Sequence, residues 1–126
     1  MPSTQRTGYL LLVDDHDDGR ELLGEFLEMN GFSVKSAASA EEALGLLASE
    51  GAPSVVVTDL SLGDMSGAEL ARKIRETPAT AKVPIVAATG HSGFEDTDGL
   101  FAAVLVKPVP LASLVDTLDQ AMKAAS

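Results

Sequence analysis

A chain of 126 residues, 45% hydrophobic and 22% charged, is long enough for one folded domain and too apolar for a disordered segment. Its 19 acidic against 9 basic residues give a formal net charge of −10, which argues against direct nucleic-acid binding because such modules present a basic surface. The sequence has no cysteine, which fits a reducing compartment. It also has no run near the ~20 apolar residues of a membrane span and no apolar signal-peptide core. We therefore expect a cytoplasmic protein without membrane contact.

Five short apolar segments rich in β-branched residues recur along the chain and are typical of strands. They cover residues 9–13, 32–36, 55–58, 84–88 and 104–106. The first, third and fourth are apolar almost without interruption. That pattern indicates parallel strands that helices cover on both faces.

Helical patterns lie between the strands. Residues 19–29 place their leucines and Phe26 on one face, and Asn30-Gly31 ends this helix. Ser39 and Ser66 are each followed three residues later by glutamate, the capping-box pattern that marks a helix start. Residues 111–122 carry another apolar stripe and predict the last helix.

Strands and helices that alternate with short connections predict an α/β fold, an open, doubly wound parallel sheet with helices on both faces. We expect a single domain over residues 1–126, with a core of about residues 8–122 and frayed termini.

Polar side chains stand where the predicted strands end, at the edge of a parallel sheet where ligands bind. They are Asp14 and Asp15, Asp59, Thr89 and Lys107. Three carboxylates in one pocket repel each other and favour a hard cation such as Mg²⁺. A carboxylate held by a metal, beside a lysine and a hydroxyl, suits phosphoryl transfer, with Asp59 as the acceptor.

Four motifs together resemble the receiver domain of bacterial two-component response regulators, in particular the receivers of hybrid histidine kinases, over roughly residues 9–122. They are Leu-Leu-Val-Asp-Asp (11–15), Val-Val-Thr-Asp-Leu-Ser-Leu-Gly-Asp-Met-Ser-Gly (56–67), Ala-Ala-Thr-Gly (87–90) and Leu-Val-Lys-Pro-Val (105–109). The resemblance implies a flavodoxin-like sheet with strand order 2-1-3-4-5.

The resemblance also implies a function and the residues that perform it. Asp59 would receive a phosphoryl group from a histidine kinase or a histidine phosphotransfer protein, with Thr89 as the switch hydroxyl and Lys107 as the counter-charge of the phosphate. A cis peptide would precede Pro108. The Mg²⁺ or Mn²⁺ ligands would be Asp14, Asp15, Asp59 and the backbone carbonyl of Ser61.

Other polar residues have simpler interpretations. Asp17 and Asp18 are expected to be structural, at the positive end of a helix dipole. His16 and His91 fit no zinc motif and are expected to be solvated loop residues. His91, two residues after Thr89, also stands where the family tunes the lifetime of the phosphoryl group.

Two departures from the family pattern concern signal output. Val104 stands three residues before Lys107, where an aromatic switch residue is usual. The segment from Thr89 to Lys107 is short and contains poor helix formers, so the fourth helix of the fold is expected to be shortened or missing. We hypothesise that phosphorylation orders residues 91–99 instead.

Two further function classes remain open. A binding module of the same fold that signals without phosphorylation is favoured by the altered output segment and opposed by the complete set of site residues. A small phosphohydrolase would place its nucleophile after the first strand and carry a cap region, and the sequence has neither. We expect no enzyme acting on a separate substrate, but a phosphoacceptor that promotes its own phosphorylation and dephosphorylation.

Overall fold

Five parallel strands form the centre of the molecule in the computed structural model, which describes residues 8–90 and 99–125. The strands are β1 (Leu10–Val13), β2 (Val34–Ala37), β3 (Val55–Asp59), β4 (Ile85–Thr89) and β5 (Ala103–Val106). Their order is β2-β1-β3-β4-β5, and every neighbouring pair is parallel. The predicted sheet and its strand order are confirmed.

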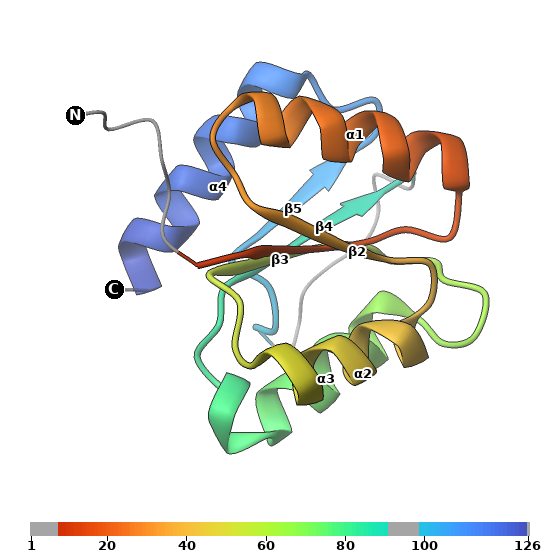
Figure 1. Ribbon diagram of the computed structural model, residues 1–126, viewed down its shortest axis with the longest axis vertical. Coiled ribbons are helices and arrows are strands. Elements are labelled where there is room, and N and C mark those ends of the chain that lie inside the picture. Colours follow the sequence, from red (N-terminus) through yellow and green to blue (C-terminus); the bar gives the residue numbers. More distant parts are fainter. Residues whose placement is uncertain (1–7, 91–98, 126) are drawn as a thin grey trace.

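Helices cover both faces of this sheet (Figure 1). They are α1 (Asp17–Met29), α2 (Ala40–Glu50), α3 (Gly67–Glu76) and α4 (Leu111–Ala125), with a 3-10 turn at Pro78–Thr80. Alternate residues of β1 point to opposite faces. Leu11 and Val13 therefore pack with α2 and α3, whereas Leu10 and Leu12 pack with α1 and α4. The doubly wound architecture follows from these two cores.

The serines of the two predicted capping boxes cap the starts of α2 and α3. The Ser39 hydroxyl accepts a hydrogen bond from the backbone N–H of Glu42 (3.1 Å), and the Glu42 carboxylate accepts one from the backbone N–H of Ala38 (2.6 Å). The Ser66 hydroxyl likewise accepts a hydrogen bond from the backbone N–H of Glu69 (3.1 Å). These side chains satisfy N–H groups that a helix start leaves without a partner.

The region between β4 and β5 is where the sequence predicted a shortened helix. Gly90 and residues 99–102, which the structure describes, are not helical. Most of this segment, including His91 and the part that we expected to become ordered on phosphorylation, lies outside the described residues. The label α4 accordingly belongs to the C-terminal helix.

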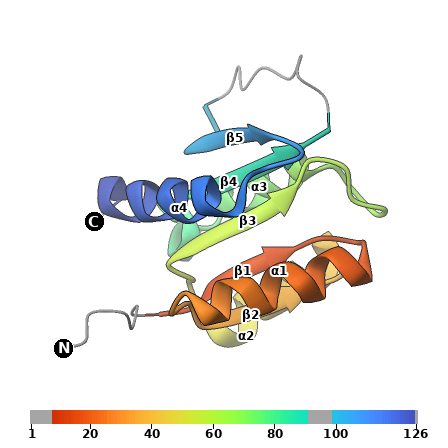
Figure 2. The same ribbon diagram turned by 90° about the horizontal axis from the view of Figure 1, so that it is seen from above.

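The strand order reverses between β1 and β3, and this reversal positions the site. From above, α1 lies over β1 and β2, and α4 lies over β3 and β4 (Figure 2). Connections from neighbouring strands that diverge in this way leave a crevice at the carboxyl ends of β1 and β3. No helix among the described residues is long and apolar enough to span a membrane.

Candidate functional site

Three carboxylates and one imidazole meet in this crevice. Asp14 and Asp15 follow β1, Asp59 is the last residue of β3, and His16 precedes α1. One ligand atom from each of these four residues lies within 4.8 Å of the others. Asp59 is buried, with 7% of its surface exposed, so the cluster extends from the sheet to the solvent.

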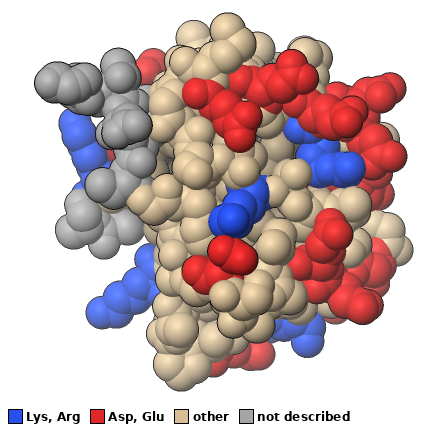
Figure 3. Space-filling view, in the orientation of Figure 1, with Lys and Arg blue, Asp and Glu red and all other residues tan. Residues whose placement is uncertain are grey.

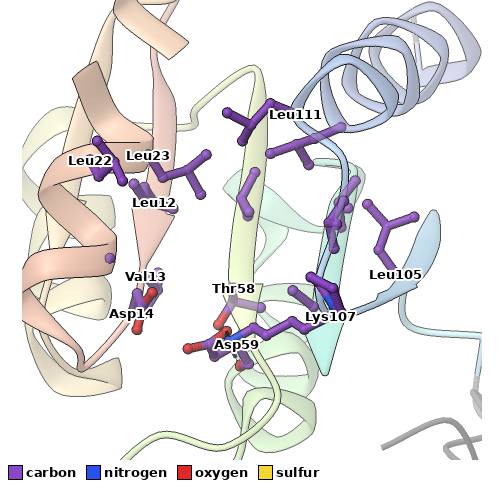
Figure 4. Close-up of a pocket in the computed structure, with 17 residues that line it drawn as sticks. Leu12, Val13, Asp14, Leu22, Leu23, Thr58, Asp59, Leu105, Lys107 and Leu111 are labelled. Atoms are coloured by element: carbon purple, nitrogen blue, oxygen red, sulfur yellow. Dashed lines mark hydrogen bonds and ion pairs between the residues drawn. The ribbon is translucent and has the colours of Figure 1, made fainter. Parts of the chain in front are cut away.

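Lys107 joins this cluster from the far side of the crevice. Its Nζ atom lies 2.6 Å from Oδ1 of Asp59 (Figure 4). The backbone holds the lysine in place, since its N–H donates a hydrogen bond to the carbonyl of Thr89 (2.7 Å). The peptide bond between Lys107 and Pro108 is cis, as the family resemblance implied. The ammonium group therefore lies directly against the buried carboxylate of Asp59.

The electrostatics of the cluster separate Asp59 from Asp14. Burial raises the pKa of Asp59 to about 6, and the neighbouring Asp14 acts in the same direction, although Lys107 opposes both. Burial also acts to raise the pKa of Asp14, but hydrogen bonds from the backbone of His16, from Asp59 and from the imidazole, together with the charge of Lys107, lower it below its ordinary value. An additional positive charge would favour the ionised form of both groups.

Ser61 and Thr89 lie beside the same pair of charges. Together with Asp59, Lys107 and His16 they line a hollow of about 530 Å³. Thr89 is buried at the end of β4, and Ser61 is exposed in the loop after β3. The structure thus brings together every residue that the sequence assigned to the site.

A second, mostly apolar groove of about 550 Å³ begins at Asp59 and Lys107 and runs between α1 and α4. Figure 4 shows Leu22 and Leu23 on the α1 side, Leu111 on the α4 side and Asp14 at the polar end. Leu22 is 71% exposed, which is unusual for leucine. Large apolar side chains are therefore accessible next to the charged cluster.

Acidic residues also surround the site. In Figure 3 they gather along the right-hand side, where the strands end and where α1 and α2 begin in Figure 1. The first turns of these two helices contribute Asp17, Asp18, Glu41 and Glu42. Acidic groups favour the positive end of a helix dipole, as predicted for Asp17 and Asp18.

Several supporting contacts were not predicted from the sequence. The Arg20 guanidinium donates hydrogen bonds to the Asp14 carbonyl (2.8 Å) and to the Asp17 carboxylate (2.6 Å), and so anchors the loop after β1. The Asp64 carboxylate accepts hydrogen bonds from the backbone N–H groups of Glu41 (2.9 Å) and Ala40 (3.1 Å), which lower the pKa of Asp64. Asp64 thereby ties the loop after β3 to the start of α2.

Gly67 makes the other unpredicted contact. A Cβ atom at this position would overlap the backbone carbonyl of Asp59 and crowd the Cα atom of Leu60. Only glycine lets α3 begin this close to the end of β3.

His16 was expected to be a solvated loop residue, and its side chain is indeed 76% exposed. The expectation missed its contacts. Its Nδ1 atom lies 3.1 Å from Oδ1 of Asp15 and 3.3 Å from Oδ1 of Asp14. The sequence did contain a signal for these contacts, because His16 directly follows Asp14 and Asp15.

The donor set fits a divalent cation. Hard cations prefer oxygen ligands, and Asp14, Asp15 and Asp59 supply carboxylate oxygens from a cluster whose mutual repulsion a cation would relieve. The raised pKa of the buried Asp59 shows that Lys107 alone does not offset burial and the charge of Asp14.

Several known proteins are similar to this chain in sequence. The family profile of the response regulator receiver domain matches residues 10–119. The "14.6 kDa protein in sodA1 3′ region" of Leptolyngbya boryana is 36% identical over 115 residues, which are 88% of this chain and 87% of that protein. The sensor histidine kinase RcsC of Salmonella typhi is 31% identical over 94% of this chain. The matched region is only 13% of the length of that kinase.

Solved structures of a sensor protein and of a response regulator share the fold of this chain. A sensor protein from Polaromonas sp. JS666 superposes with a TM-score of 0.86 at 26% identity, covering 96% of this chain and all of the other. The response regulator TrrA of Thermotoga maritima, solved in complex with Mg²⁺ and BeF, superposes with a TM-score of 0.81 at 28% identity, covering 90% of this chain and 98% of TrrA. The chain therefore belongs to the response-regulator receiver family, the phosphoacceptor domains of two-component signalling.

Proposed function

We propose that Asp59 is the phosphoacceptor of this receiver domain and that Lys107 and Thr89 assist the transfer. The observation that carries the proposal is the 2.6 Å contact between Lys107 and a buried Asp59 beside two further carboxylates. A buried carboxylate can act as a nucleophile, and a fixed cation next to it can stabilise the negative charge of the phosphorylated product.

In the proposed step, a carboxylate oxygen of Asp59 attacks the phosphorus atom of a phosphohistidine. The P–O bond forms as the P–N bond breaks, and the donor leaves as neutral imidazole because its other ring nitrogen carries a proton. Lys107 then balances the negative phosphoryl oxygens, and the Thr89 hydroxyl can donate a hydrogen bond to one of them.

The cofactor in this proposal is Mg²⁺ or Mn²⁺, held by Asp14, Asp15, Asp59 and the carbonyl of Ser61. Bound there, the cation would supply positive charge that keeps Asp59 ionised and screens the incoming phosphoryl oxygens. Asp14 and Asp15 would orient it, and Arg20 fixes the backbone from which Asp14 projects.

The proposed donors are a histidine kinase or a histidine phosphotransfer protein, which would meet the domain in the cytoplasm. The apolar groove between α1 and α4 supports docking of a protein donor, because it opens directly beside Asp59 and has exposed leucines at its rim. Since the domain would be its own substrate, we propose that it promotes its own phosphorylation and dephosphorylation and turns over no separate substrate.

A structural observation weighs against each competing function. An aspartyl phosphohydrolase would place its nucleophile after the first strand, whereas the buried, lysine-paired carboxylate here follows β3. The intact pair of Lys107 and Asp59 favours a phosphorylated domain over a receiver-like module that signals without phosphorylation.

Incubation with acetyl phosphate and Mg²⁺, followed by intact-protein mass spectrometry, tests the proposal. One phosphoryl group should add to the parent chain, none to Asp59→Asn, and labelling of Lys107→Ala should slow roughly a hundredfold because a fixed charge beside the transferred oxygens is lost. The controls are Asp64→Asn, in the loop after β3 with its carboxylate hydrogen-bonded to the start of α2, and the exposed Lys82→Ala. Labelling of Asp59→Asn at the parent rate would show that the acceptor is another residue.

A further inference from the structure

The imidazole of His16 belongs to the same cluster as the carboxylates that fit a divalent cation. We propose that His16 is a nitrogen ligand of this cation and that it raises the affinity of the site for Mn²⁺, Co²⁺ and Ni²⁺ relative to Mg²⁺. The inference depends on one part of the proposed function, namely that the site binds a divalent cation.

The distances around His16 match those of an octahedral cation. With metal–ligand bonds of about 2.1 Å, adjacent ligands lie about 3.0 Å apart and opposite ligands about 4.2 Å apart. The Nδ1 atom lies 3.1 Å from the carboxylate of Asp15 and 3.3 Å from that of Asp14, close to two adjacent positions. The full set of four ligand atoms fits within 4.8 Å, so a small contraction would close it around one ion.

The backbone already holds His16 at this position. Its N–H donates a hydrogen bond to the Asp14 carboxylate (2.9 Å), and its carbonyl accepts one from the N–H of Arg20 (2.9 Å). The Arg20 side chain in turn holds the Asp14 carbonyl. Coordination therefore requires a small rotation of the ring, whose side chain is largely exposed, and the tautomer that carries its proton on Nε2 and leaves the Nδ1 lone pair free for the cation.

The ring also faces the site rather than the solvent alone. His16 lines the hollow that holds Asp59, Lys107, Ser61 and Thr89. It has no helix-capping role that would explain its position, because its side chain makes no capping hydrogen bond to α1.

The chemistry of the nitrogen sets the expected selectivity. Carboxylate and carbonyl oxygens suit Mg²⁺ and Mn²⁺, whereas imidazole suits later transition ions, whose affinity for nitrogen donors rises from Mn²⁺ through Co²⁺ to Ni²⁺. Replacing one oxygen or water ligand by Nδ1 should therefore affect Ni²⁺ strongly and Mg²⁺ little.

Calorimetric titration of the full chain with Mg²⁺, Mn²⁺, Co²⁺ and Ni²⁺ tests this selectivity. The variant is His16→Asn, because asparagine is a preferred residue at a helix N-cap and offers an oxygen in place of the nitrogen. We expect the ratio of Ni²⁺ to Mg²⁺ affinity to fall roughly tenfold or more. His91→Asn, which changes the only other histidine of the chain, is the matched control and should leave the ratio unchanged.

A spectroscopic measurement identifies the ligand directly. The electron spin echo of bound Mn²⁺ should show modulation from an imidazole nitrogen in the parent chain and in His91→Asn, and should lose it in His16→Asn. Nitrogen modulation that persists in His16→Asn, or an unchanged affinity ratio, overturns the inference and leaves the phosphoacceptor proposal intact. A parent chain that binds none of the four ions overturns both the inference and the proposed cofactor.

Discussion

Asp59 lies between an opposite charge on Lys107 and a like charge on Asp14, in a position that water scarcely reaches. Burial and Asp14 outweigh the lysine, so the pKa of Asp59 rises from 3.8 to about 6. In the metal-free protein the charged form of this residue therefore opposes folding. A cation or a phosphoryl group bound at Asp59 would change the local charge and would therefore alter this balance.

The raised pKa predicts how Asp59→Asn changes stability with pH in the absence of metal. Because the folded pKa lies above the unfolded one, protonated Asp59 contributes stability that is complete below about pH 3.8 and lost as the pH rises through about 6. Asparagine does not titrate. Relative to the parent, Asp59→Asn should therefore become more stable by on the order of 2 kcal/mol as the pH rises from about 4 to about 8.

Urea unfolding of both proteins in a chelating buffer measures this difference. A stability difference that stays constant across the pH range would show that Asp59 titrates normally and that its burial has no electrostatic cost.

The loop between β3 and α3 connects Asp59 to two helices. Gly67 lets α3 start against the backbone of Asp59, and Asp64 caps the start of α2 with its carboxylate. Both contacts position a helix N-terminus relative to β3, the strand that ends at Asp59. A change at Asp59 therefore has a short structural route to α2 and α3.

Gly67→Ala should show how closely that loop is fitted. Its methyl group would displace the end of β3, so we expect a loss of about 1–3 kcal/mol in stability and slower labelling by acetyl phosphate. The matched control is Gly45→Ala in α2, where a Cβ atom meets nothing within 4 Å. That change should stabilise the helix by up to about 1 kcal/mol. Equal effects of the two changes on stability and labelling would contradict the proposed close fit.

Local patterns explain which elements could be predicted. The caps at Ser39 and Ser66 and the apolar runs of β1 and β3 are signals within a few residues, and the site residues follow because parallel strands end at one edge. Contacts that join distant segments carry no such signal. Nothing near Asp64 in the sequence indicates that it caps a helix that begins 24 residues earlier. His16 was expected to be a solvated loop residue because its spacing fits no zinc motif.

At the scale of the whole molecule, the proposed cation site would couple ligand binding to folding. Asp14 and Asp15 come from the loop after β1, and Asp59 comes from β3, so the ligand set exists only when the sheet is assembled. A cation that binds the folded state alone stabilises the domain by mass action.

Calorimetric melting with and without Mg²⁺ should therefore show an increase in melting temperature. At a concentration ten times the dissociation constant, binding contributes about 1.4 kcal/mol, which corresponds to roughly 5 °C for a domain of this size. Asp15→Asn should reduce the increase, while Asp116→Asn, on the exposed side of α4, should keep it. A melting temperature that is indifferent to Mg²⁺ in the parent would argue against the site.

The central claim is that the phosphoryl group is carried by Asp59, and its position can be determined chemically. Borohydride reduces an acyl phosphate on aspartate to homoserine, so fragmentation of the chain after labelling with acetyl phosphate and Mg²⁺ and then reduction identifies the acceptor. Homoserine should appear at position 59 and at no other aspartate. Homoserine at position 14, 15 or 64, or a labelled chain with none at position 59, would contradict the account.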